Sequence, residues 1–140
     1  MFLKKLKWDE KYLTGVKIID TQHQNIFEEY NLFCGKINNE TYSHKDIETF
    51  LKDLNYYTTI HFETEEEFME KENYPLYNSH KKRHNFFRAV YEEIKDNKFL
   101  RDAAEGLFTL HLAETVAYWL ESHIETYDKQ LADFLKERGY

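Results

Sequence analysis

The stretch from His61 to His84 constrains the fold more than any other part of the chain, because it carries two pairs of potential metal ligands. His61 and Glu65 are four residues apart, and so are His80 and His84. Residues four apart lie on the same face of an α-helix, one turn above each other, so each pair could bind a common ion. This spacing predicts a helical ligand pair at each end of the stretch.

The sequence Asn73-Tyr74-Pro75 separates the two pairs. The residue before a proline disfavours helical geometry, whereas proline itself is well tolerated in the first turn of a new helix. We therefore expect a helix, a tight turn and an antiparallel helix. In that arrangement both ligand pairs face one space between the helices.

The remaining sequence indicates an all-α protein with a bulky aromatic core. It has only four Gly and one Pro, but 11 Phe, 11 Tyr and two Trp, and it has the length of one domain. Apolar residues recur with a helical period over four ranges, about 20–38, 44–72, 76–96 and 103–136. Residues 1–18 are predicted to form an extended N-terminal arm anchored by Trp8. The expected fold is an antiparallel up-down-up-down four-helix bundle.

Charge and composition exclude several classes of partner. The net charge of −7, without a clustered basic face, argues against nucleic acid. The sequence lacks the run of about 18 apolar residues needed to span a membrane, and its opening segment lacks the apolar core of a signal peptide, so we expect a cytoplasmic protein. A single cysteine, Cys34, excludes an internal disulfide and a CxxC motif; we expect it to be buried and not to bind metal.

Each predicted helix contributes to a possible metal site. The candidate ligands are His23 from the first helix, His61 and Glu65 from the second, His80 and His84 from the third, and His123 and Asp128 from the fourth. This excess of imidazole over carboxylate favours Fe, Zn or Mn and disfavours Ca or Mg. Seven ligands are too many for one ion. If both carboxylates and a hydroxide bridge two octahedral ions, a single position remains open for a small ligand.

The spacing of His123 and Asp128 also favours two ions. At the pitch of an ideal α-helix, residues five apart point roughly 140° away from each other. These two side chains are therefore predicted to lie at opposite margins of the buried face. They are therefore not expected to hold one ion in the way that a pair four residues apart does, and they suit a site with two ions.

Each of these signals also has a simpler explanation. A lone buried histidine such as His23 is more often hydrogen-bonded in the core, and single His-x-x-x-His pairs arise by chance. Their concurrence carries the argument, because so many unpaired polar groups on buried faces would cost several kcal/mol. His44 and His111 fall outside the buried faces, and we expect both to be exposed.

Taken together, these motifs resemble the hemerythrin family, specifically the single-domain bacteriohemerythrins. The matching stretches are Trp8-Asp9 with Gly15, Ile19-Asp20 with His23, HFETEEEFM, Tyr74-Pro75 followed by His80-x-x-x-His84-x-x-Phe87, and WLESHIETYDK. The resemblance implies a non-haem di-iron centre that binds O2 reversibly. One iron would be held by His80, His84 and His123 and the other by His23 and His61, with Glu65, Asp128 and a hydroxide as bridges.

With this ligand set, the coordination count makes the first iron six-coordinate and the second five-coordinate, which predicts where O2 binds. O2 is expected at the iron held by His23 and His61, where small anions such as azide would bind the oxidised form. By similarity to the family, Leu120 and Trp119 are candidates to line the O2 pocket, together with Phe62 and Met69.

The expected function is O2 storage, transport or delivery by a protein that is not an enzyme. An electron donor or an O2-consuming enzyme could act as its partner. The alternatives are a di-iron redox enzyme acting on O2, peroxide or nitric oxide, a sensor with a separate output protein, and a metal-free interaction bundle. A ferritin-like oxidase is disfavoured, because no histidine has Glu three residues before it.

Overall fold

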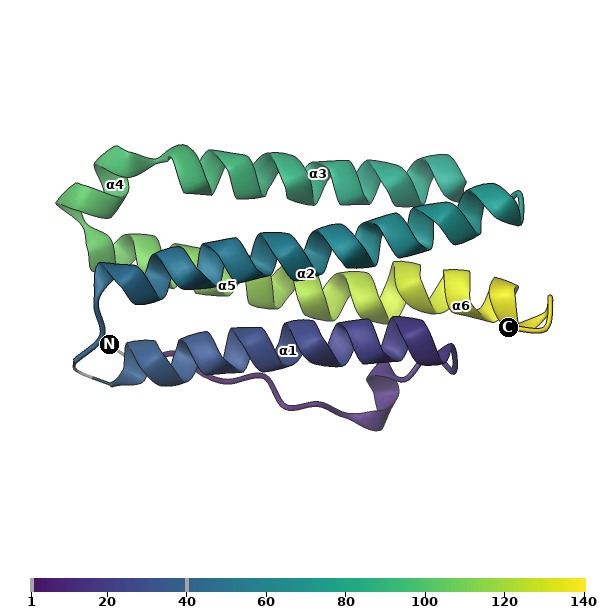
Figure 1. Cartoon of the computed structure of the whole chain (residues 1–140), viewed down its shortest axis with the longest axis horizontal. Coiled ribbons are helices and arrows are strands. Elements are labelled where there is room, and N and C mark those ends of the chain that lie inside the picture. Colours follow the sequence, from purple (N-terminus) through teal and green to yellow (C-terminus); the bar gives the residue numbers. More distant parts are fainter. Residues whose placement is uncertain (1, 40) are drawn as a thin grey trace.

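The computed structural model describes residues 2–39 and 41–140, which form an antiparallel bundle of long helices (Figure 1). The long helices are α1 (Lys17–Asn38), α2 (His44–Lys71), α3 (Tyr77–Asp96) and a last helix made of α5 (Glu105–His123), the π-helical segment η2 (Ile124–Asp128) and α6 (Lys129–Lys136). Two shorter helices are η1 (Glu10–Tyr12) and α4 (Lys98–Ala103). The described residues contain no strand, and the predicted all-α bundle is confirmed.

The N-terminal arm lies along α1 (Figure 1). Two asparagines of α1 hydrogen-bond to the backbone of the arm. The Asn31 side chain accepts from the N–H of Leu6 and donates to its carbonyl, and the Asn38 side chain does the same with Leu3. Trp8, the predicted anchor, packs edge-on against Phe27 with ring centroids 5.0 Å apart. These contacts hold the extended segment in place without regular secondary structure.

The helix α1 begins earlier than the predicted position near residue 20, because Asp20 organises the turn that precedes it. Its carboxylate accepts hydrogen bonds from the backbone N–H and hydroxyl of Thr14 and from the N–H of Gly15. Gly15 has a φ of +88°, which a residue with a Cβ rarely adopts. The Asp20 carboxylate thus joins the arm to the first turn of α1.

Replacing Asp20 with alanine should destabilise the fold by about 1–2 kcal/mol, the usual effect of losing a capping side chain. Chemical denaturation would measure the loss. Glu28→Ala is a matched control, because Glu28 is an exposed acid on the same helix, and it should change stability by much less. Equal effects of the two substitutions would show that the Asp20 hydrogen bonds contribute little.

The apolar core is divided into two clusters. The larger runs from Leu3 in the arm to Ile124 and includes most buried side chains of the long helices. The smaller consists of Val16, Ile19, Met69, Tyr74, Leu131, Ala132 and Leu135. On each long helix except α3, the predicted ligands fall between residues of the two clusters. The bundle therefore places a polar layer between two apolar ones.

The other differences from the predicted fold are local. The segment between α3 and α5 contains the unpredicted helix α4, whose N-cap is Asn97. Leu110 of α5 is apolar but 37% exposed. Cys34 is buried, as predicted. Among the described residues, no helix is long and apolar enough to span a membrane.

Candidate metal centre

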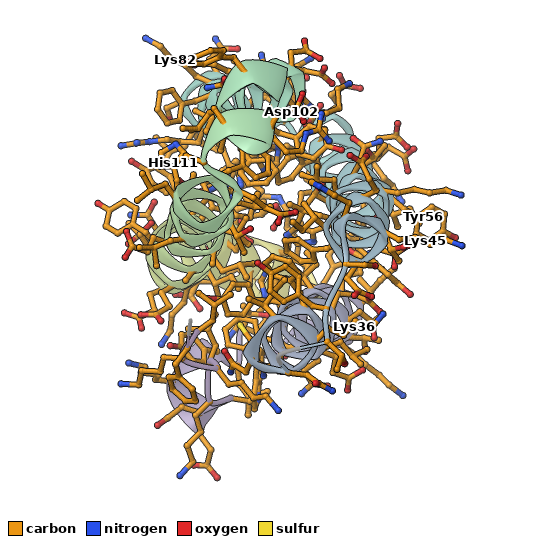
Figure 2. All side chains as sticks on the ribbon, turned by 90° about the vertical axis from the view of Figure 1, so that its left-hand side faces the viewer. Lys36, Lys45, Tyr56, Lys82, Asp102 and His111 are labelled. Carbon is orange, nitrogen blue, oxygen red and sulfur yellow. The ribbon has the colours of Figure 1, made fainter. Side chains whose placement is uncertain are left out.

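All seven predicted ligands lie in the polar layer between the two apolar clusters, and none is more than 2% exposed. They come from the four long helices: His23 from α1, His61 and Glu65 from α2, His80 and His84 from α3, His123 from the end of α5 and Asp128 from the end of η2. By contrast, His44 is largely exposed beside Glu105. His111 is also exposed, at the periphery of the bundle when it is viewed end-on (Figure 2).

The seven side chains form two groups in which potential ligand atoms lie within 4.8 Å of one another. One group contains Glu65, His80, His84, His123 and Asp128, and the other contains His23, His61, Glu65 and Asp128. Both carboxylates therefore belong to both groups. Two neighbouring cations that share two bridging carboxylates require such an arrangement.

Asp128 lies between the two groups with one oxygen directed at each. Its Oδ2 is 2.6 Å from His23 Nε2 and 3.0 Å from His61 Nε2. Its Oδ1 is 3.0 Å from His80 Nε2 and 2.9 Å from His123 Nε2. A carboxylate in this position could contact two ions at once.

Glu65 approaches both groups through one oxygen. Its Oε1 is 3.3 Å from His61 Nε2, 3.3 Å from His80 Nε2 and 3.1 Å from His84 Nε2. The other oxygen, Oε2, is buried without a hydrogen-bond partner among the described residues. Glu65 thus retains an unused ligand atom beside the two groups.

Several other buried atoms of the layer also lack hydrogen-bond partners among the described residues. They include His80 Nε2, His123 Nε2 and Asp128 Oδ1, which lie close to one another but without the geometry of a hydrogen bond. Leaving such atoms unpaired in the interior is costly, whereas metal ions would provide each of them with a partner. Five imidazoles with two carboxylates suit a transition metal such as iron. The residues present therefore fit a metal centre.

The pKa values of both carboxyl groups are lowered, which favours the charged form that binds cations. Burial and the neighbouring Asp128 raise the pKa of Glu65. The opposing effect of His61, His80 and His84 is larger and brings this pKa down to about 2. Burial likewise raises the pKa of Asp128, and the surrounding histidines, His123 foremost, bring it well below its usual value. Both side chains are therefore ionised at neutral pH.

The histidines respond unequally to the same surroundings. Burial lowers the pKa of His80, but Asp128 and Glu65 raise it more strongly, to about 10. Burial lowers the pKa of His123 despite the same two carboxylates. A cation binding at His80 would replace a proton, so metal binding to the folded chain should release protons.

The geometry of His123 and Asp128 contradicts the expectation from ideal helix geometry. These residues are not about 140° apart, because the chain between them forms the π-helical segment η2. A π-helical turn is closed by hydrogen bonds between residues five apart, so the side chains at its two ends share one face. His123 Nε2 and Asp128 Oδ1 consequently face the same space, 2.9 Å apart. The predicted separation of the two side chains to opposite margins is therefore wrong, and both belong to the larger group.

The comparison with known families agrees with this geometry. The family model for the hemerythrin HHE cation binding domain matches residues 14–135, a range that includes all seven side chains of the two groups. The chain belongs to the hemerythrin family. The resemblance seen in the sequence motifs is thereby confirmed.

Hemerythrins of bacteria are similar to this chain over nearly its whole length. The bacteriohemerythrins of Pseudomonas paraeruginosa and Pseudomonas aeruginosa are 30% and 31% identical to it, in each case over 94% of this chain and 82% of the relative. The bacteriohemerythrin of Clostridium acetobutylicum is 25% identical over 90% of this chain and 98% of its own.

Two side chains that hydrogen-bond to candidate ligands of this hemerythrin were not predicted. Gln22 Oε1 lies 2.9 Å from His61 Nδ1, and Glu66 Oε2 lies 2.8 Å from His84 Nδ1. Such hydrogen bonds to the outer nitrogen fix the tautomer and the ring orientation of a metal-binding histidine. Each residue is adjacent in sequence to a predicted ligand, which could have marked it as close to the site. The sequence could not indicate its partner, because the histidine it binds lies on a neighbouring helix.

Two of the four pocket candidates, Phe62 and Trp119, pack against the histidines and against each other. The Phe62 ring stacks on His84 with centroids 4.1 Å apart, and the Trp119 ring stacks on His123 at 4.7 Å. Leu120 is buried in the same larger cluster as Phe62. Met69, in contrast, is buried in the smaller cluster on the other side of the polar layer.

Proposed function

We propose that this hemerythrin binds O2 reversibly at a pair of iron ions, for oxygen storage, transport or delivery, and that it is not an enzyme. The observation that carries the proposal is the position of Asp128, whose two oxygens are directed at two separate sets of imidazoles. The family resemblance supports iron as the metal and O2 as the ligand. An unidentified electron donor would restore the reduced form.

In this proposal one iron is held by His80, His84 and His123, and the other by His23 and His61. Glu65 and Asp128 would contribute to both positions, together with a hydroxide. Because His23 and His61 supply only two imidazoles, their position would have room for a small ligand such as O2. When bound, the two irons supply the electrons that hold O2 and recover them when it leaves.

The protein's own contribution is an apolar surrounding that limits the access of water and protons to the site. Phe62 and Trp119 cover the histidines with rings, and Leu120 adds apolar bulk without a hydrogen-bond donor. Exclusion of water from a reactive site suppresses side reactions and proton access. These side chains should therefore favour the release of intact O2 over its reduction.

Stopped-flow mixing of the reduced protein with O2, followed by removal of O2, tests the function. We expect a rapid spectral change that reverses when O2 is removed, with O2 recovered and no peroxide formed. Steady consumption of O2 with an added electron donor, faster than release, would instead assign the chain to the redox enzymes.

Azide should bind the oxidised protein at the iron held by His23 and His61, because the coordination count leaves its open position there. A crystal structure of the azide complex would locate the anion. Azide on the iron held by His80, His84 and His123 would contradict the assignment of the five histidines to the two ions.

A further inference from the structure

We propose that Glu66 and Gln22 make the two metal positions electronically unequal, Glu66 by lowering the reduction potential of the position held by His80, His84 and His123. This inference rests on the proposed iron pair. It concerns the hydrogen bonds made by histidine Nδ1, the ring nitrogen that faces away from the two groups of ligand atoms.

The outer nitrogens of the histidines are supported very differently. Nδ1 of His84 faces the Glu66 carboxylate, and Nδ1 of His61 faces the Gln22 amide. Nδ1 of His23 and of His80 is buried without a partner among the described residues. Each metal position thus includes one histidine with a strong outer hydrogen bond. In one position the acceptor is an anion, and in the other it is a neutral amide.

The orientation of the Gln22 amide is determined by its other contact. Its nitrogen donates to the hydroxyl of Thr64 at 3.0 Å, and that hydroxyl donates in turn to the carbonyl of Ile60. The amide oxygen is therefore the atom that faces His61. It accepts the Nδ1 proton, and Nε2 is left free to bind metal.

Glu66 is held by an equally specific contact, but with a charge. Its Oε2 accepts from Arg88 at 2.9 Å as well as from His84. The Arg88 guanidinium also lies 4.9 Å from the centre of the Phe62 ring, which stacks on His84. The contact with Arg88 fixes the position of the Glu66 carboxylate. Because Arg88 is partly exposed, solvent screens its positive charge, and it offsets only part of the negative charge of Glu66.

An anionic acceptor and a neutral one have different effects on the metal. The carboxylate draws the Nδ1 proton of His84 towards itself, which makes the ring a stronger electron donor through Nε2. Stronger donation and a nearby negative charge both favour the more highly charged ferric ion over the ferrous one. The position that includes His84 should therefore be reduced less readily than the position that includes His61.

Potentiometric titration of the iron-loaded protein tests this difference. In Glu66→Gln an amide oxygen can still accept the hydrogen bond but the charge is lost, so we expect a higher potential. Replacing an outer-shell partner typically costs about 10–100-fold in metal affinity or activity. A tenfold change in the ferric–ferrous equilibrium corresponds to about 59 mV for one electron. Gln22→Glu should shift the potential of the other position downwards, and Glu66→Asp should restore most of the original value.

Glu67→Gln is the matched control, because it removes the same charge one residue along, from an exposed side chain. The proposal is wrong if Glu66→Gln shifts the potential no more than this control, or if it lowers the potential. It is equally wrong if the zinc-loaded protein shows no Nδ1 proton resonance of His84 that changes in Glu66→Gln. The measurements do not depend on O2 binding. A failure of the proposed function would appear separately, in the metal content or the O2 reaction of the unsubstituted protein.

Discussion

Replacing Asp128 with alanine should abolish stable binding of both iron ions, whereas replacing His44 with alanine should leave two irons per chain. Asp128 directs one oxygen at each group of histidines, so its loss removes a ligand from both positions at once. Losing an outer-shell partner typically costs about 10–100-fold in metal affinity, and losing a shared ligand should cost more. Glu65→Ala should have a similar effect. Iron per chain, measured after loading and desalting, gives the result.

The helix content must be measured together with the metal content, because a variant that unfolds would also lose iron. Asp128→Asn keeps the size of the side chain and removes its charge, and the two apolar clusters on either side of the polar layer remain intact. Helix content measured by circular dichroism should therefore persist while iron is lost. A single iron in the unsubstituted protein, or equal iron loss in His44→Ala, would exclude a dinuclear centre.

The parts of this site that depend on one helix could be predicted from the sequence. His61 and Glu65 share a face of α2 and His80 and His84 share a face of α3, because a spacing of four residues fixes their relation in any regular α-helix. The turn at Pro75 then makes the two helices antiparallel. His23 could be placed because it follows the apolar period of its own helix.

The parts that depend on departures from regular geometry could not be predicted. Apolar periodicity assumes a constant pitch, and nothing in it indicates that η2 would be π-helical and bring His123 and Asp128 onto one face. After Asp128 the buried residues are Leu131, Ala132 and Leu135.

Contacts between helices also could not be predicted from the sequence. Gln22 and Glu66 bind histidines on neighbouring helices, so their roles depend on how each helix is rotated against the next. The position of Met69 in the smaller cluster depends on the height of the polar layer along the bundle, which the spacing of residues in α2 alone does not define.

Replacing Leu120 with alanine should speed both binding and loss of O2, and should accelerate oxidation of the reduced protein. Leu120 is 1% exposed and lies one turn before His123 in α5, within the larger apolar cluster. Removing its side chain would leave a cavity through which water could approach the metals. The cavity should also cost about 2–5 kcal/mol of stability. Leu107→Ala is the matched control, because Leu107 is on the same helix but 64% exposed.

Leu120→Tyr separates the effect of bulk from that of a hydrogen-bond donor. Its ring would keep water out while its hydroxyl could donate to bound O2, so we expect slower O2 release than in the unsubstituted protein. Both Leu120 variants should retain two irons, since Leu120 is not a predicted ligand. Stopped-flow measurements of O2 dissociation and oxidation on the variants and the Leu107→Ala control would decide the matter. If the rates of both Leu120 variants equalled those of the control, Leu120 would lie outside the O2 pocket, and the exclusion of water would have to come from Phe62 and Trp119.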